Sequence, residues 1–294
     1  MTRGERRNVW IGLAFVGPWI MGFLAFTLYP VLASLYYSFC DYDVLTSPIW
    51  VGTLNYRDMF ADSIFWKSLY NTFYFALFAL PLGLLISLVL AVLLNQSVRG
   101  RPAFRAIYFL PSLIPVVAAA MAWLWILNGN FGVLNHLLEY FHIQGPQWLT
   151  DEKWTKPSII LMTIWGCGNT VVIYLAALQD VPRSLYESAE IDGASAWSKF
   201  RHITIPLISP VTYFNLIMGL IGSLQVFAQA YIMLGGGGVN RSALFYTVYL
   251  YQCAFDYHQM GYASAMAWIL FLIILLLTCV VTRSTRKLVF YGGE

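Results

Sequence analysis

A short charged segment, residues 186–194, carries the most specific pattern of this sequence. It reads Tyr-Glu-Ser-Ala-Glu-Ile-Asp-Gly-Ala and lies between two long apolar runs. Glu187 and Glu190 place carboxylates on either side of the small residues Ser188 and Ala189. Small side chains at these two positions allow the backbone of a partner to approach closely. This is the arrangement of a docking surface.

The elements that hold this segment are predicted to be membrane helices. Of the 294 residues, 59% are hydrophobic and 11% are charged, against about 25% charged residues in an average soluble domain. The apolar residues gather in runs of about twenty, the length that crosses ~30 Å of hydrocarbon. Six predicted spans cover residues 10–36, 69–94, 106–127, 158–178, 210–234 and 263–281.

None of the six runs contains Asp, Glu, Lys or Arg. An unpaired charge at the bilayer centre costs a few kcal/mol or more. Runs without charges argue against a proton relay, an ion pump or a voltage sensor, and they suit a neutral solute. We therefore expect an all-α, polytopic membrane protein.

The positive charges predict how the chain is oriented. With the N-terminus in the cytoplasm, 12 of the 17 Lys and Arg residues lie inside, and five lie outside. This satisfies the positive-inside rule with both termini cytoplasmic, so the net charge of +3 does not indicate nucleic-acid binding. The first run is longer than a signal-peptide core and lacks a small-residue cleavage site, so a retained helix is expected. The expected organisation is one membrane domain, 10–282, between cytoplasmic tails 1–9 and 283–294.

The charged segment belongs to a longer connection, residues 179–209, on the cytoplasmic side. Ser184 is a candidate N-cap for a helix over 185–191, Asp192-Gly193 turns the chain, and 195–203 forms a second short helix that stops before Pro206. The connection is therefore predicted to be a helix-turn-helix lying across the face of the bilayer.

Other patterns point to ordinary structure. No GxxxxGK[ST] motif occurs, so the chain binds no nucleotide of its own. His136, Glu139 and His142 repeat every three residues, but a surface helix over 134–141 is favoured over a metal site. A disulfide between Cys40 and Cys253 is disfavoured, and the four glycines 235–238 suit an external turn. No cofactor and no metal are expected.

The pattern Glu-Ser-Ala-x-x-Asp-Gly-Ala, followed by Phe-x-x-Ile-x-Ile-Pro-x-x-x-Pro, resembles the EAA loop of permease subunits of bacterial binding-protein-dependent ABC importers. Ser188 and Ile205 depart from the usual Ala and Leu with little change in size. The stretches Val51-Gly52, Asn71-Thr72, Phe104-Arg105, Phe109-Leu110-Pro111 and Gly261-Tyr262-Ala263 are similar to the carbohydrate branch of that family, which includes permeases for maltose and glycerol phosphate.

The resemblance implies a role and a set of partners. The EAA loop of that family seats in a separate ATPase, which would make Glu187, Ser188, Ala189, Asp192, Gly193 and Ala194 the coupling residues. A second homologous permease, a dimeric ATP-binding subunit, an extracytoplasmic sugar-binding protein and the lipid bilayer are the implied partners. The implied location is the bacterial cell membrane, and the chain itself is not expected to be an enzyme.

A neutral sugar would need hydroxyl-pairing side chains and an aromatic face near the middle of the bilayer. The candidates are Thr163, Trp165, Asn169 and Thr170 in the fourth run and Asn215, Ser223, Gln225, Phe227 and Gln229 in the fifth. In the maltose permease, the helices that flank the EAA loop hold the sugar. By this resemblance, Ser223 and Gln225 lie at positions that correspond to that site. Each of these residues has an alternative role, a hydrogen bond to a neighbouring helix worth about 0.6 to 2 kcal/mol.

Three alternatives remain at this level. The same permease role could serve a glycerol phosphate or a polyol, although spans without Lys or Arg favour an uncharged solute. A secondary transporter working alone would need an ionisable residue within a span or an internal repeat. A membrane-embedded enzyme would need Ser-His or two Asp at one depth, and none of these features is visible.

Overall fold

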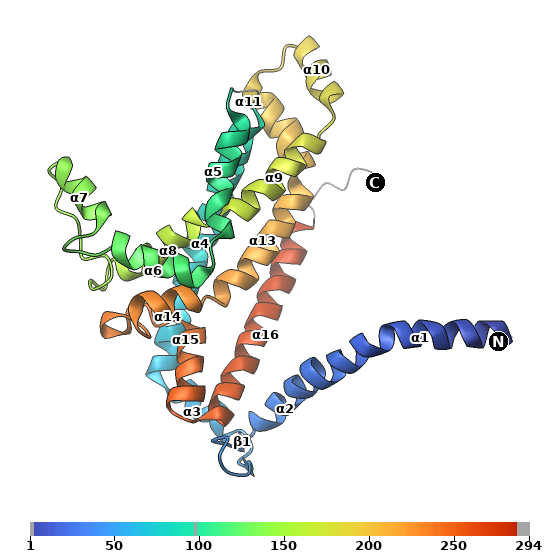
Figure 1. The fold of residues 1–294 in the computed structure, drawn as a ribbon, viewed down its shortest axis with the longest axis vertical. Coiled ribbons are helices and arrows are strands. Elements are labelled where there is room, and N and C mark those ends of the chain that lie inside the picture. Colours follow the sequence, from blue (N-terminus) through green and yellow to red (C-terminus); the bar gives the residue numbers. More distant parts are fainter. Residues whose placement is uncertain (1–2, 97–98, 287–294) are drawn as a thin grey trace. The chain divides into compact units, whose positions relative to one another are not determined.

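The computed structural model describes residues 3–96 and 99–286 of the chain. Its contacts divide the chain into two compact units, with bounds Met1–Asp62 plus Leu250–Phe271 and Ser63–Tyr249 plus Leu272–Glu294. Both units are mostly helical (Figure 1). The start of the predicted N-terminal tail and most of the predicted C-terminal tail, from residue 287 on, lie outside the described residues.

Unit 1 contains the first predicted span. Its elements are α1 Arg3–Phe23, a π-helical turn Leu24–Leu28, α2 Tyr29–Tyr37, β1 Cys40–Asp41, β2 Ile49–Trp50, α3 Leu54–Ala61 and a π-helical turn Gln252–Asp256. The two short strands pair in antiparallel fashion, with Cys40 opposite Trp50. The helical stretch Trp10–Tyr37 is long and apolar enough to cross a membrane, in agreement with the predicted span.

A small polar network organises the loop that follows α2. The Asn55 side-chain amide donates to the backbone oxygens of Ser38 (3.0 Å) and Cys40 (2.9 Å). The Gly261 amide donates to the Tyr42 carbonyl at 3.0 Å. A Cβ at Gly261 would lie 2.1 Å from the Cys40 oxygen, so only glycine allows this close approach. The four cysteines form no disulfide, and Cys40 and Cys253 are buried.

Unit 2 contains most of the helices. They are α4 Ser63–Asn95, α5 Arg101–Leu113, α6 Val116–Ile126, α7 Val133–Tyr140, α8 Thr155–Trp165, α9 Gly168–Asp180, α10 Arg183–Ile191, α11 Ala196–Lys199, α12 Ile205–Leu207, α13 Ser209–Leu224 and α14 Ala228–Leu234. Two elements follow, a 3-10 turn Val239–Arg241 and α15 Tyr246–Tyr251. The last helix, α16 Met260–Thr285, has residues in both units.

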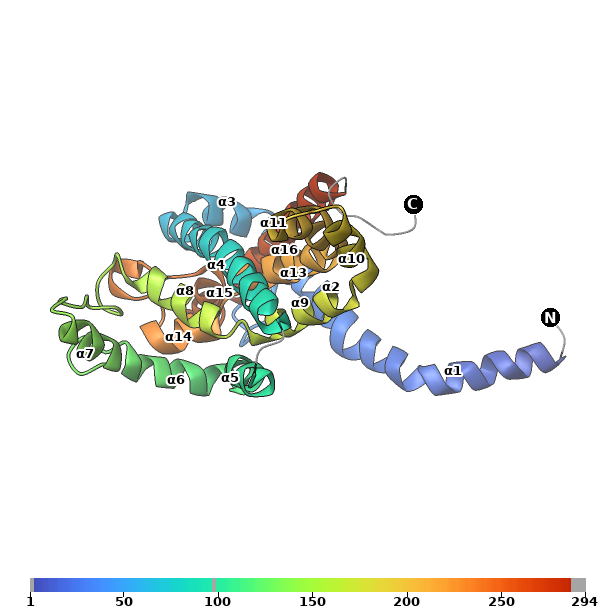
Figure 2. The same cartoon turned by 90° about the horizontal axis from the view of Figure 1, so that it is seen from above.

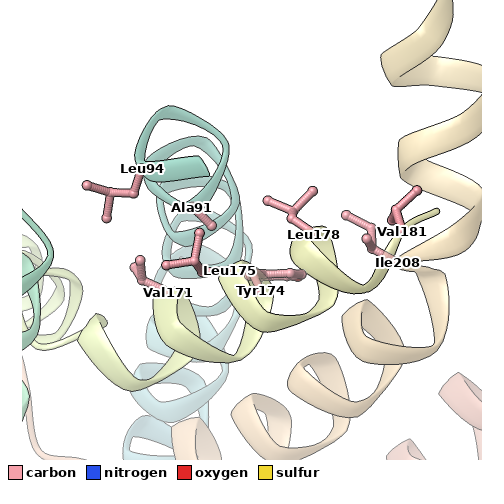
Figure 3. Packing of buried hydrophobic residues seen from close by; sticks show 8 residues of the cluster. All are labelled: Ala91, Leu94, Val171, Tyr174, Leu175, Leu178, Val181 and Ile208. Carbon is pink, nitrogen blue, oxygen red and sulfur yellow. The ribbon is translucent and has the colours of Figure 1, made fainter. Parts of the chain in front are cut away.

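The long helix α4 is the centre of unit 2. It packs against α8, α9 and α13, and one of its buried faces meets α9 in an apolar cluster. Figure 3 shows the side chains of Val171 and Leu175 on α9 directed toward Ala91 and Leu94 on α4. Burial of such side chains orients α9, and with it the connection that follows α9.

Three of the predicted spans are interrupted by residues that lie outside any helix. The run 106–127 is divided between α5 and α6, which meet at 101°, and 158–178 between α8 and α9, which meet at 45°. In Figure 2, α5 is seen end-on while α6 is seen from the side. The first break falls at Ile114-Pro115, where Ile114 is extended as a residue before proline tends to be. The third, within 210–234, separates α13 from α14 at residues 225–227.

Two details of the predicted cytoplasmic connection are wrong. Helix α10 begins at Arg183, so its N-cap is Pro182 and not Ser184. Pro182 has the extended conformation (ψ 127°) that precedes a helix. The second helix does not stop before Pro206. It runs through a π-helical turn, Phe200–Thr204, into α12, which contains Pro206.

Hydrogen bonds hold the residues that follow the glycine run against the first part of α4. The Asn71 side-chain amide donates to the carbonyls of Arg241 (3.0 Å) and Leu244 (3.1 Å). The Tyr246 amide donates to the Thr72 hydroxyl at 2.8 Å. Asn71 and Thr72 are thus structural residues that hold two distant parts of unit 2 together.

Candidate functional site

A cavity of about 520 Å³ lies within unit 2, between α4, α9 and α13. The cavity is also lined by Thr163 and Gly166 at the end of α8 and by Gln229 on α14. None of its lining residues is charged. A cavity of this size within apolar helices is large enough for a small organic solute.

Two polar groups in this cavity have no hydrogen-bond partner among the described residues. They are the Ser87 hydroxyl on α4 and the side-chain amide nitrogen of Asn215 on α13, both buried. A buried polar group left unpaired costs about 1 to 3 kcal/mol. Other hydroxyls of the wall are already used, because Ser223 donates to the Leu220 carbonyl (3.0 Å) and Thr163 to that of Ile159 (2.8 Å). Ser87 and Asn215 are therefore the groups best placed to bind a hydroxyl-bearing ligand.

Broken helices border this cavity. Helix α8 ends at Trp165, the chain turns through Gly166 and Cys167, and α9 begins at Gly168. Gly168 lies against α5, where a Cβ would be 2.8 Å from the Tyr108 carbonyl oxygen. Irregular backbone at membrane depth is tolerated where it lines a cavity or is buried in protein, and the break between α8 and α9 obeys this rule, because Gly166 and Cys167 line the cavity.

A second, smaller cavity of about 250 Å³ adjoins the first. Trp165 and Asn169 line it, and Thr163, Gly166 and Gln229 line both cavities. Trp165 is 39% exposed and its ring makes an edge-to-face contact with that of Trp123, with ring centroids 5.8 Å apart. Aromatic rings of this kind provide large apolar surfaces for a ligand.

The predicted pathway residues fall into three groups. Thr170, Asn215 and Ser223 line the larger cavity, and Trp165 and Asn169 line the smaller one. Gln225 and Phe227 line neither and lie in the break between α13 and α14, where Phe227 stacks on Tyr231 at 5.3 Å.

Sequence reasoning missed the contribution of α4. Ser87 and Gly83 face the larger cavity one helical turn apart. A signal existed, because Ser87 is the one hydroxyl-bearing aliphatic side chain between Thr72 and Asn95 in a long apolar run.

The predicted docking segment forms α10, which Figure 1 shows projecting at one end of unit 2. Glu187, Ser188, Asp192 and Gly193 are exposed, whereas Ala189 and Ala194 are half-buried. The Tyr186 hydroxyl shares a 2.8 Å hydrogen bond with that of Thr204. The Lys199 ammonium contacts the Glu190 carboxylate at 2.5 Å. These two contacts tie α10 to the helical segment that continues into α13.

The turn after α10 needs Gly193. Its φ is +75°, a left-handed value that other residues adopt at a cost. The Gly193 amide donates to the Glu190 carbonyl (3.0 Å) and the Ala194 amide to the Ala189 carbonyl (2.8 Å). This pair of bonds is a Schellman cap, and it ends α10 with its last carbonyls satisfied.

Helices long enough to span a bilayer, an uncharged cavity between them and an exposed helical segment at one end together define a membrane transport component. Four described helices are long and apolar enough to cross a membrane, and the two bent pairs would raise the number to six. The comparisons with known proteins agree with this class.

The chain belongs to the family described as "Binding-protein-dependent transport system inner membrane component", whose model matches residues 79–289. It is 41% identical over 297 residues to the probable ABC transporter permease protein YesP of Bacillus subtilis (strain 168), across 100% of this chain and 96% of that protein. It is 34% identical over 282 residues to the lactose transport system permease protein LacF of Rhizobium radiobacter, with 94% of each covered.

The fold is also that of a solved transporter. A chain in the crystal structure of a bacterial alginate ABC transporter, in complex with an alginate pentasaccharide-bound periplasmic protein, matches with a TM-score of 0.86. The match covers 97% of this chain and 96% of that chain at 24% sequence identity. The protein is therefore a multi-pass membrane component of a binding-protein-dependent transport system.

Proposed function

We propose that this chain is the permease subunit of an ABC importer and forms half of the translocation pathway for a sugar or oligosaccharide. The observation that carries the proposal is the uncharged cavity between α4, α9 and α13, with two unpaired buried polar groups in its wall. A neutral solute rich in hydroxyl groups satisfies both groups without bringing a charge into the membrane. The lactose permease among the relatives supports this substrate class.

The proposed topology has six spans with both termini in the cytoplasm. Each bent pair, α5 with α6 and α8 with α9, then counts as one crossing, and residues 10–282 form one membrane domain. Residues 179–209 lie in the cytoplasm as the EAA loop. The sidedness rests on the 12 Lys and Arg residues that this arrangement places inside.

Energy would reach the pathway through α10. A separate, dimeric ATPase docks against Glu187, Ser188, Ala189, Asp192, Gly193 and Ala194, and its closure moves the adjoining helices as a body. The contacts of Tyr186 with Thr204 and of Lys199 with Glu190 support this role, because they link α10 to the helical segment that leads into α13. A second homologous permease and an external sugar-binding protein complete the transporter, and the family's description supports dependence on a binding protein.

Glu187→Lys tests the coupling role. Glu187 is exposed and has no packing function in the chain, so reversal of its charge leaves the fold intact and weakens only the contact with the ATPase. We expect co-purification of the ATPase subunits and ATP-driven uptake of radiolabelled lactose, maltose or an arabinooligosaccharide to fall at least tenfold. The matched control is Glu139→Lys on α7, also exposed, which keeps both. Unchanged association and unchanged uptake in Glu187→Lys would contradict the proposal.

A further inference from the structure

Two nitrogen atoms of a half-buried arginine on α5 have no partner among the described residues. The Nε and Nη2 atoms of Arg105 are both buried, and neither is hydrogen-bonded to any residue within 3–96 or 99–286. Arg101, one turn earlier, is fully used: its Nε donates to the Leu94 carbonyl (2.8 Å) and its Nη2 to that of Asn95 (3.0 Å), which caps the end of α4. Buried donors without an acceptor are unfavourable, and a guanidinium makes its strongest hydrogen bonds to anions, so Arg105 calls for an anion.

Arg105 lines a separate cavity of about 370 Å³ between α5, α9 and the end of α4. Its inner wall is part of the apolar cluster of Figure 3, with Leu94, Val171 and Leu175. Its lining contains no aspartate or glutamate, and Gln179 supplies a further amide at the rim. The cavity therefore provides the donors for an anion and no acidic group to compete with one.

The rim of this cavity is apolar and open. Tyr108 on α5 and Val172 on α9 are 42% and 45% exposed, and Ile107, beside them on α5, is 63% exposed. Arg105 is the fifth residue of α5, and Gln179 is the last but one of α9. The guanidinium thus lies near the ends of both helices, which in the proposed topology is the depth at which a membrane helix meets the headgroup layer.

We propose that this cavity binds the phosphate of an anionic glycerophospholipid, with Arg105 as its ligand and the rim of Tyr108 and Val172 against its acyl chain. A free phosphate ion shares the headgroup chemistry but would leave the apolar rim uncovered. A guanidinium binds phosphate through two parallel hydrogen bonds, and Nε with Nη2 is the edge of Arg105 that has no partner in the part of the chain that the structure describes.

Native mass spectrometry of the full-length chain in neutral detergent tests the site. Dioleoyl-phosphatidylglycerol or dioleoyl-phosphatidylcholine is added in rising amounts, and the first bound lipid is counted. We expect the anionic lipid to bind at least fivefold more tightly, which corresponds to about 1 kcal/mol, and Arg105→Gln to abolish this preference. Arg99→Gln, at an exposed arginine of the same basic stretch, is the matched control and keeps it.

Further measurements distinguish the proposed lipid from other occupants of the cavity. Equal binding of the anionic lipid by the unaltered chain and by Arg105→Gln overturns the proposal, and so does full displacement by 10 mM inorganic phosphate. Ala176→Phe, which narrows the cavity and keeps the Arg105 guanidinium, should also lose the preference, and it provides the test if Arg105→Gln does not fold. Loss of the bound lipid when the transporter assembles would instead assign Arg105 to a carboxylate of a partner subunit.

Discussion

Two serines in the same cavity differ in what their hydroxyls do. Ser223 donates to the Leu220 carbonyl, as serine often does in a membrane helix, whereas Ser87 has no described partner. Both residues line the cavity between α4, α9 and α13. A group whose hydrogen bond is missing in the empty protein gains most when a ligand supplies it, so Ser87 is the stronger candidate for ligand contact.

We therefore predict that Ser87→Ala raises the solute concentration for half-maximal uptake about 3- to 10-fold. This corresponds to one neutral hydrogen bond of about 0.5 to 1.5 kcal/mol. The same change removes an unsatisfied buried hydroxyl, so the thermal unfolding midpoint of the purified chain should stay equal or rise. A purely structural serine would behave in the opposite way, with a lower midpoint.

Ser223→Ala is the control, because Ser223 lines the same cavity as Ser87. Its hydroxyl already has an acceptor in the protein, so uptake should change less than in Ser87→Ala. If the two variants shift uptake equally, or if Ser87→Ala lowers the unfolding midpoint and leaves uptake intact, Ser87 does not contact the solute.

At the scale of single elements, the end of α10 depends on one backbone conformation. Gly193→Ala places a Cβ at φ +75°, at a cost of about 1 to 2 kcal/mol. The Schellman bonds from the amides of residues 193 and 194 then open more often, so we expect their hydrogen exchange to accelerate about 5- to 30-fold. Nothing lies within 4 Å of the added Cβ, so the effect is conformational and not steric.

Gly193→Asn separates this cause from others. Asparagine adopts the left-handed region more readily than alanine, so hydrogen exchange at the amides of residue 193 and Ala194 should stay close to that of the unaltered chain. Equal acceleration in both variants would mean that a contact of the glycine, and not its φ angle, holds the end of α10.

Much of the helical organisation could be predicted from residue patterns. Apolar runs of about twenty residues indicated the helical stretches Trp10–Tyr37, Ser63–Asn95, Ser209–Leu234 and Met260–Thr285, because long runs without charges have few other solutions in a protein. The breaks were harder to predict. Pro115 divides α5 from α6, whereas Pro81 lies inside the continuous helix α4, so a proline alone does not determine whether a helix ends.

The cavity was less predictable than the helices. Thr170, Asn215 and Ser223 were found because polar residues are rare in apolar runs, but which of them face a common space depends on how α4, α9 and α13 pack. Ser87 and Arg105 show the same limit, since their unpaired atoms are defined by neighbours from distant parts of the chain.

At the scale of the whole molecule, the bent pair α5 and α6 determines how many times the chain crosses the membrane. Its 101° bend is compatible with one broken crossing or with a re-entrant loop. The two termini lie on the same side of the membrane only if both bent pairs cross it or both turn back within it. The stretch 127–154, between the two bent pairs, therefore distinguishes six crossings from four.

Six crossings predict that a cysteine at position 150 is labelled by a membrane-impermeant maleimide added outside intact cells. Thr150 is exposed, and the natural cysteines 40, 167, 253 and 279 are first replaced by alanine, with uptake measured to verify function. Ser47→Cys, outside in either arrangement, is the positive control, and Ser184→Cys should react only after the cells are permeabilised. Labelling of Thr150→Cys only after permeabilisation would mean that the bent pairs turn back within the bilayer. The cavity beside α8 and α9 would then be bordered by a re-entrant loop, and the pathway would be built around four crossing helices.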